Sequence, residues 1–242
     1  MADDELRALF TLGEFGRPFG RIGRSVRYRV DRALRSYDVV KIGDSAYDAP
    51  AEVMAALRDR THYAGFFQSE AFFADVIQTV REAYVPHPQH VSEFKTRYRH
   101  LLERPYICCH VRRTDYLQWG EGVALPVSYY TDALRSLELP PKTPVVFVGD
   151  DLSEVEAALG SCPAVRFERN LEVVDLLLMV HAAAFVSSNS SFSWWGAWLG
   201  PMTRSVLAPR FWLGFPERRE YPPGVIPPHW AQLTVASESP SP

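Results

Sequence analysis

The chain has 242 residues, of which 47% are hydrophobic and 23% are charged, so it can bury one large core or two small ones. This balance excludes a disordered protein, and a formal net charge of −3 at pH 7 argues against a nucleic-acid-binding protein. Only three cysteines are present, so we expect no disulfide framework and favour a reducing compartment. No CxxC, HExxH or histidine cluster indicates a structural metal.

The sequence shows no sign of a membrane span or a signal peptide. No apolar stretch approaches the roughly 18–20 residues that a membrane-spanning helix needs. The first ten residues, MADDELRALF, are acidic and lack the basic start and apolar run of a signal peptide. We therefore expect a cytoplasmic protein.

In chain order, the first distinctive segment runs from Arg17 to Arg35 and holds seven arginines against one acid, Asp31. Its apolar residues recur every three or four positions, which is typical of a basic amphipathic helix. Two interpretations stay open: a peripheral contact with anionic lipid or a polyanionic acceptor, and a solvated face on a globular helix.

The rest of the first hundred residues contains short elements. A strand is predicted over VVKIG (39–43), and helices are predicted over Ala49 to Arg60, Phe73 to Tyr84 and Val91 to Glu103, with VPHPQH separating the last two. At the other end of the chain, ASESPSP is typical of a frayed tail.

From Arg104 onward, strands and helices alternate at short intervals. The predicted strands are YICCHV (106–111), VVFVG (145–149), Val165 to Phe167 and AAFVSS (183–188), and the predicted helices are Tyr129 to Leu137, the helix around VEAAL (155–159), Val173 to His181 and SFSWWGAWL (191–199). Cys108 and Cys109 should point to opposite faces of the first strand. The alternation predicts an α/β fold, with a parallel sheet and helices on both of its faces.

Polar residues follow three of these strands. They are His110 to Asp115, Asp150 with Asp151, and Ser187 to Ser191. In parallel sheets, ligands bind beyond the carboxyl ends of the strands. We therefore expect the three clusters to meet at one edge of the sheet and to form a site.

Arg112 and Arg113 come directly after a buried strand. The arginine fork binds two oxygens at once, which suits a diphosphate or a carboxylate. Adjacent strand residues point opposite ways, so Cys108, His110 and Arg112 should share one side. We expect Arg112 to face the ligand and Arg113 to pair with a structural carboxylate; two arginines in a surface turn are the alternative.

Asn189, Ser190 and Ser191 precede a predicted helix. Free backbone N–H groups and the helix dipole favour an anion at that end, and exposed hydroxyls add further donors. A simple N-cap by Ser190 or Ser191 is the alternative.

The helix that follows carries tryptophans on one face. Trp194 and Trp198 are four residues apart, so we expect them to pack in the core rather than to stack on a sugar. We expect Gly196 to permit the close approach of a neighbouring strand.

Three aspartates lie at predicted helix starts. Asp151 with Glu154 fits a capping box, so we expect Asp150 and Asp151 to bond the helix start and the ligand. A metal site of the DxD kind is the alternative. Asp175 begins a helix, where a carboxylate complements the dipole.

Together these motifs resemble the α1,2-fucosyltransferases, which form a wider group with the α1,6- and O-fucosyltransferases. CHVRRTDY resembles the group's H-x-R-R-x-D motif, VVFVGDD its second, strand–acid motif, and DLLLMVHAAAFVSSNSSFSWWGAWL its third motif. YAGFFQSEAFF is similar to the family's GYFQSxxYF segment, and LAPRFWLGF to the stretch after the last helix. The resemblance covers most of residues 60–215.

The resemblance implies a GT-B-like fold, with a shortened acceptor-side α/β half in residues 1–103, a C-terminal Rossmann-type half in 104–235 and a tail in 236–242. It implies transfer of L-fucose from GDP-fucose to the 2-hydroxyl of a terminal galactoside, with inversion and without a metal or another cofactor. The acceptor would be a galactose-terminated oligosaccharide or glycolipid.

The resemblance also implies roles for individual residues. His110 and Asp175 correspond to guanine contacts, Arg112 to a diphosphate contact, and Ser190 and Ser191 to the phosphate-side loop. The further substrate-binding candidates are Arg113, Asp150, Asp151, Asn189 and Phe192.

The family opens with a Gly-rich GGLGNQMFQ segment that this sequence lacks. DELRALFTLGEF resembles a stretch further into the family, so we expect an incomplete N-terminal sheet with an exposed edge or a partner chain covering it. The rival interpretations are a family member that binds a nucleotide or glycan without catalysis, and another nucleotide-sugar transferase of GT-B type.

In the implied reaction, negative charge grows on the β-phosphate while an acceptor hydroxyl attacks fucose C1. Arg112 and the amides of Ser190 and Ser191 would stabilise that charge. Asp115 is the candidate general base and Glu121 the second candidate. A role for Asp115 in orienting Arg113 is the alternative.

Overall fold

The computed structural model describes residues 38–42, 50–59, 61–64, 67–119, 122–138, 140 and 142–236. The predicted basic helix from Arg17 to Arg35, Glu121, and tail residues 237–242 lie outside the described residues. No helix within the described ranges is long and apolar enough to cross a membrane.

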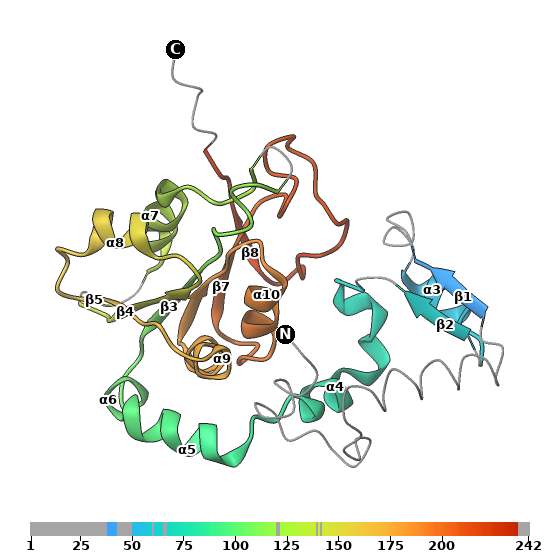
Figure 1. The fold of residues 1–242 in the computed structure, drawn as a ribbon, viewed down its shortest axis with the longest axis horizontal. Helices are drawn as coiled ribbons and strands as arrows, with labels where there is room; N and C mark the ends of the chain where they lie inside the picture. The colour runs from blue at the N-terminus through green and yellow to red at the C-terminus, as the bar shows by residue number, and fades with distance from the viewer. Residues whose placement is uncertain are drawn as a thin grey trace.

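The centre of the fold is a parallel sheet of six strands (Figure 1). Its strands are β3 (Ile107–Val111), β4 (Val145–Gly149), β5 (Val165–Phe167), β6 (Ala184–Val186), β7 (Ser205–Pro209) and β8 (Ala231–Leu233), in the order β5-β4-β3-β6-β7-β8. Counted from β3, this is the 3-2-1-4-5-6 order of a Rossmann-type sheet. The expected α/β class, a Rossmann-type parallel sheet with helices on both faces, is confirmed.

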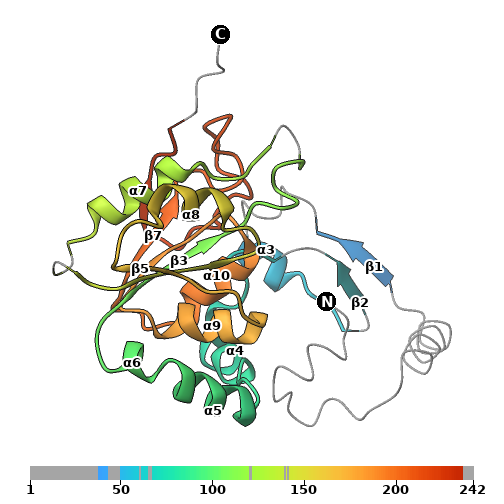
Figure 2. The ribbon, with the colours of Figure 1, turned by 60° about the vertical axis from the view of Figure 1, so that its left-hand side comes forward.

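Helices cover both faces of the sheet (Figures 1 and 2). One face packs against α7 (Val127–Ser136) and α8 (Ser153–Leu159), and the other against α5 (Pro88–Arg97), α6 (Arg99–Leu102), α9 (Glu172–His181) and α10 (Ser191–Trp198). The side chain of Cys109 packs on the face covered by α7 and α8, and that of Cys108 packs on the face covered by α9 and α10, as strand alternation predicts. Both cysteines are free thiols.

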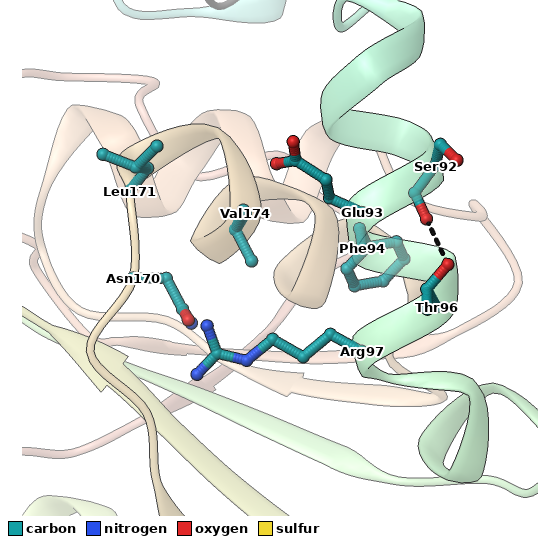
Figure 3. A pocket seen from close by; sticks show the side chains of 8 residues that line it. All are labelled: Ser92, Glu93, Phe94, Thr96, Arg97, Asn170, Leu171 and Val174. Atoms are coloured by element: carbon teal, nitrogen blue, oxygen red, sulfur yellow. Dashed lines mark hydrogen bonds between the residues drawn. The ribbon is translucent and has the colours of Figure 1, made fainter.

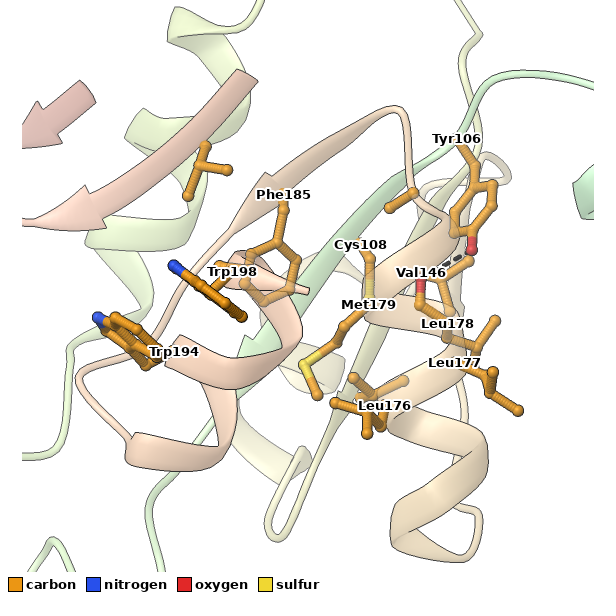
Figure 4. Packing of buried hydrophobic residues seen from close by; sticks show 14 of the residues in the cluster. Tyr106, Cys108, Val146, Leu176, Leu177, Leu178, Met179, Phe185, Trp194 and Trp198 are labelled. Atoms are coloured by element: carbon orange, nitrogen blue, oxygen red, sulfur yellow. Dashed lines mark hydrogen bonds between the residues drawn. The ribbon is translucent and has the colours of Figure 1, made fainter. Parts of the chain in front are cut away.

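The core between α9 and α10 is rich in large side chains (Figure 4). Trp194 and Trp198 are buried, and their rings stack with centroids 5.9 Å apart, which confirms that these tryptophans pack in the core. A Cβ at Gly196 would lie 2.7 Å from the sulfur of Met179. Gly196 therefore permits close approach of the helix α9; the expected neighbour, a strand, was wrong.

A smaller parallel unit precedes the sheet. β1 (Asp38–Lys41) pairs with β2 (Thr61–Ala64), and α3 (Pro50–Ala55) connects them. In Figure 1 this βαβ unit lies to one side of the six-stranded sheet. The 3-10 helices η2 (Glu70–Phe72) and η3 (Ala74–Val76) and the helix α4 (Ile77–Ala83) follow, and the ring of Phe73 packs edge-on against Trp198, 5.2 Å away.

Several element boundaries differ from the sequence predictions. The helix predicted from Val91 begins at Pro88, because proline is favourable at the first helical position, and it divides at Tyr98 into α5 and α6. The helix predicted from Ala49 to Arg60 spans only the α3 residues, and the one predicted from Phe73 begins with 3-10 turns.

The strands β2, β7 and β8 were not predicted. They contain three to five residues each, a length at which hydrophobic periodicity distinguishes a strand from a loop only weakly. The division of the chain at residue 103 stays a prediction.

Candidate functional site

The candidate site lies where the strand order reverses. β3 pairs with β4 on one side and with β6 on the other, so the connections from β3 and β6 leave in opposite directions across the sheet. A crevice at the carboxyl ends of such neighbouring strands is the usual ligand site of doubly wound sheets. The residues after β3 and after β6, which the sequence analysis selected, flank this position.

Arg112 follows β3 and is held by two carboxylates. Its Nε lies 2.8 Å from Oδ1 of Asp115, and its Nη1 lies 3.2 Å from Oδ2 of Asp150. Burial opposes ionisation, but the hydrogen bond to Asp115 and the charge of Asp150 raise the pKa of Arg112 above its ordinary value. Neither of these two ion pairs uses Nη2 of Arg112, so the N–H groups of that nitrogen can donate to an incoming anion.

Asp150 orders the loop that carries Arg112. Its carboxylate accepts hydrogen bonds from the backbone N–H of Arg113 at 2.9 Å and from the hydroxyl of Thr114 at 2.5 Å. A Cβ at Gly149 would lie 2.1 Å from the carbonyl oxygen of Val111, so only glycine lets the end of β4 approach β3 this closely. Asp150 is therefore an internal anchor of the first motif.

Arg113 is buried on the opposite side of β3. It donates to the carbonyl of Leu125 at 3.2 Å and forms an ion pair with Glu154 at 2.5 Å. Its carboxylate partner is thus Glu154, and the alternative in which Asp115 orients Arg113 is wrong because Asp115 pairs with Arg112.

The predicted capping box at the start of α8 is also wrong. Glu154 is engaged with Arg113, and Asp151 bonds the N–H of Ser153 at 3.0 Å instead of closing a reciprocal pair. Within the ranges that the structure describes, no three His, Cys, Asp or Glu side chains cluster as metal ligands would.

The loop after β6 is more buried than its composition suggests. Ser187, Ser188 and Asn189 are fully buried, and their side chains bond within the protein. Ser187 meets the hydroxyl of Ser193 at 2.9 Å, and Asn189 donates to the carbonyl of Val123 at 2.8 Å. The expectation of exposed hydroxyls along the whole segment is wrong, since the first three side chains support the loop.

The start of α10 is partly accessible, because Ser190 is buried whereas Ser191 is exposed. Ser190 takes the N-cap position, but its side chain makes no capping hydrogen bond, so the simple side-chain cap is wrong. Ser191 is the first helical residue and is exposed, and Phe192 is half-buried. The free backbone N–H groups and the helix dipole at this end favour an anion.

His110 connects the two motifs. Its Nδ1 lies 2.8 Å from the hydroxyl of Ser188, and its ring meets Phe192 edge-on at 5.5 Å. Burial lowers the pKa of His110 to about 4, with Arg112 adding to the shift and Asp150 opposing it. His110 is therefore neutral at pH 7 and acts through hydrogen bonding or packing.

Asp175 lies buried in the first turn of α9, which packs against β3. Its Oδ1 accepts a hydrogen bond from Asn170 at 2.9 Å. Burial raises the pKa of Asp175 to about 7; Glu172 and Glu168 add to the shift, and Asn170 opposes it. A carboxyl group with this pKa can accept or donate a hydrogen bond near neutral pH.

A cavity of about 440 Å³ lies between α5 and α9 (Figure 3), and one of its lining residues, Asn170, is the residue that bonds Asp175. Arg97 from α5 reaches toward Asn170, and Leu171 and Val174 form the α9 side of the cavity. Its mixture of apolar walls with a few polar groups suits a flat heterocyclic ring.

The structure also brings Gln68 and Tyr116 to the site, although the sequence analysis did not select them. Gln68 donates a hydrogen bond to the hydroxyl of Ser191, and Tyr116 donates to the carbonyl of Asn189 at 3.4 Å. The quoted YAGFFQSEAFF segment contained Gln68, but no local pattern indicates a partner 123 positions away.

Comparison with known proteins decides the family. The model of glycosyl transferase family 11 matches residues 44–214. The chain belongs to this family. The match spans all three motifs, which confirms the fucosyltransferase-like family expected from the sequence.

Two curated relatives of this family 11 chain come from Escherichia coli. An alpha-1,2-colitosyltransferase is 27% identical over 216 residues, which are 84% of this chain and 73% of that protein. The O-antigen biosynthesis glycosyltransferase WbnK is 33% identical over 114 residues, which are 43% of this chain and 37% of WbnK.

Among solved structures, the fold is similar to the fucosyltransferase NodZ from Bradyrhizobium, with a TM-score of 0.47 and 16% identity over 64% of this chain. An alpha-1,6-fucosyltransferase NodZ structure soaked with GDP-fucose gives a TM-score of 0.44 at 16% identity and the same coverage of this chain. The family 11 chain spans 58% and 57% of these two structures, respectively.

Proposed function

We propose that this glycosyltransferase moves L-fucose from GDP-fucose to the 2-hydroxyl of a terminal galactoside, with inversion at the sugar carbon. The observation that carries the proposal is the parallel pairing of β3 with β6, because Arg112 follows the carboxyl end of β3 and α10 follows that of β6. A guanidinium and a helix N-terminus on two sides of one crevice are complementary to a diphosphate.

The donor would lie across this crevice. The diphosphate would bind Arg112 and the amides at Ser190 and Ser191, and the guanine base would lie toward Asp175 and His110. A carboxylate can accept two N–H donors from guanine, which favours its ionised form.

The bond to the leaving group breaks as negative charge grows on the β-phosphate. Arg112 and the α10 amides are fixed donors at that position, so they would stabilise the transition state more than the ground state. Each charge-assisted hydrogen bond would contribute about 1.5–3 kcal/mol. Because these groups already supply positive charge, we expect transfer to proceed without a metal.

Asp115 is the candidate general base for the acceptor hydroxyl, with Glu121 second. In the free protein Asp115 is bound to Arg112, which holds its carboxylate beside the diphosphate position. Diphosphate oxygens compete for the same guanidinium. Donor binding would therefore release Asp115 for the acceptor proton, which couples base activation to the presence of the donor.

The proposed linkage and the proposed donor sugar are supported by different observations. The name of the colitosyltransferase relative includes an alpha-1,2 linkage, which supports attack by a 2-hydroxyl. That relative also favours a second candidate function, colitosyl transfer with the same linkage. Comparing nucleotide-activated fucose and colitose as donors would distinguish the two, since the better donor gives the larger kcat/KM.

The test of the proposal is GDP release. GDP-fucose, a β-galactoside and the protein should together give GDP and a fucosylated product, with α stereochemistry visible by NMR. A protein that binds GDP but gives no product with either donor would be the non-catalytic nucleotide- or glycan-binding member that forms the rival interpretation. A larger shift in melting temperature with UDP or another nucleotide would instead indicate a different nucleotide sugar.

A further inference from the structure

We propose that Leu117 and Trp119 form a ledge that binds the acceptor saccharide beside the donor. The proposal rests on the proposed function, because it places the acceptor next to the diphosphate site. It assigns residues to acceptor binding, for which the donor contacts identify none.

The ledge is exposed but well ordered by its backbone. Leu117 is 51% exposed and Trp119 is 48% exposed, in a turn directly after the first motif. The N–H of Leu117 bonds the carbonyl of Arg113 at 2.8 Å, and the N–H of Trp119 bonds the carbonyl of Asp115 at 3.0 Å. Two large apolar side chains exposed in one hydrogen-bonded turn form a small apolar surface next to the first motif.

A continuous row of side chains joins the ledge to the donor site. The ring of Tyr116 lies 6.2 Å from that of Trp119, and the guanidinium of Arg112 lies 5.7 Å from the centre of the Tyr116 ring. The Tyr116 hydroxyl bonds the carbonyl of Asn189 in the loop after β6. The ledge is therefore fixed relative to both motifs that hold the diphosphate.

The chemistry of the ledge fits a neutral sugar. A pyranose has an apolar face of C–H groups that packs on an aromatic ring, and its hydroxyls need polar partners at the edge of that ring. Asp115 and Gln118 flank the apolar side chains in the same turn, and both are exposed. A sugar resting on Trp119 would present hydroxyls toward Asp115, which is the candidate base.

The experiment compares Trp119→Ala with Trp119→Phe, which keeps a ring, and with Met202→Ala as a control. Met202 is 66% exposed and lies between α10 and β7, at the amino end of that strand and away from the site. Three quantities are measured for each: the KM for lactose and N-acetyllactosamine, the rate of GDP-fucose hydrolysis without acceptor, and the Kd for GDP.

We expect Trp119→Ala to raise the acceptor KM at least tenfold while hydrolysis and GDP affinity stay within about twofold of the parent protein. Trp119→Phe should recover most of the acceptor affinity, and Met202→Ala should change nothing. An unchanged acceptor KM in Trp119→Ala overturns the proposal that the ledge binds the acceptor. If the oligomeric state of this variant changes while its KM does not, the proposal is also overturned, because the surface then binds a second copy of the chain.

A direct binding measurement separates this proposal from the proposed function. Saturation-transfer NMR of the two galactosides is recorded with GDP present, which requires no turnover. If the parent protein shows no transfer but binds a galactoside through Trp119, the ledge stands and the proposed reaction fails. If the parent protein transfers fucose and Trp119→Ala binds galactosides normally, the reaction stands and the ledge fails.

Discussion

The Nδ1 of His110 lies 2.8 Å from the hydroxyl of Ser188, so a side-chain hydrogen bond joins the end of β3 to the loop after β6. Both residues are buried, and neither faces bulk solvent. This contact holds together the two motifs that supply Arg112 and the start of α10. The proposed donor site therefore depends on a connection between neighbouring strands as well as on the groups that would face the ligand.

The first prediction concerns Arg112 and Asp115. Arg112→Ala should abolish transfer and weaken GDP binding roughly 10- to 150-fold, which corresponds to about 1.5–3 kcal/mol for the lost charge-assisted hydrogen bond. Asp115→Asn should reduce transfer and keep GDP binding. Calorimetric titration with GDP and an assay of product formation measure the two effects, and normal GDP binding by both variants would place the diphosphate elsewhere.

The second prediction concerns the pH dependence of GDP binding. Burial raises the pKa of Asp175 to about 7 in the free protein, so its carboxyl group is largely protonated at pH 6. If guanine N–H groups bind the ionised form, binding at pH 6 releases a proton, and the Kd for GDP rises by up to about tenfold per unit as the pH falls below 7. Above pH 7 the Kd becomes flat.

The number of protons released on GDP binding is measured by calorimetry at pH 6 in buffers of different ionisation enthalpy. Asp175→Asn should reduce the pH dependence between 6 and 7 to the part that the terminal phosphate of GDP contributes, since its second pKa is about 6. Glu168, Glu172 and Arg97 still surround the position in this variant. Proton release that persists undiminished in Asp175→Asn would assign it to another group.

The fold was largely predictable because β3 and β4 are continuous apolar runs and the α9 and α10 segments have helical periodicity. The positions of Arg112 and Ser190 at strand ends followed from the parallel order. The burial of Ser187 to Asn189 was not predictable, because a run of hydroxyl groups has the same pattern whether its donors face solvent or bond within a loop. The ion pair of Arg113 with Glu154 depends on how α8 packs, which no local spacing shows.

The third prediction concerns Gln68, which was not selected from the sequence. It donates to the hydroxyl of Ser191, so it fixes the first residue of α10 from the other side of the crevice. Gln68→Ala should weaken GDP binding roughly 2- to 12-fold, as expected for one hydrogen bond worth about 0.5–1.5 kcal/mol. Gln78→Ala is the matched control, because Gln78 is exposed on α4 and donates a hydrogen bond to Glu82 of the same helix.

The fourth prediction concerns stability away from the ligand. Arg204 is half-buried, and its guanidinium donates to carbonyls at the C-terminal ends of α9 and α10, including those of Met179 and Gly196. Arg204→Met leaves these carbonyls without their donor, so the free energy of unfolding should fall by at least about 2 kcal/mol. Urea denaturation measures this loss. As a control, Arg166→Met, at an exposed position on β5, should leave the free energy of unfolding nearly unchanged.

The central claim is that the arginine after β3 and the start of α10 bind one diphosphate. A crystal structure of the protein with GDP tests it most directly. The account predicts β-phosphate oxygens within about 3 Å of both the Arg112 guanidinium and the backbone amides of Ser190 or Ser191. A diphosphate bound to only one of these groups, or at the other end of the sheet, would contradict it.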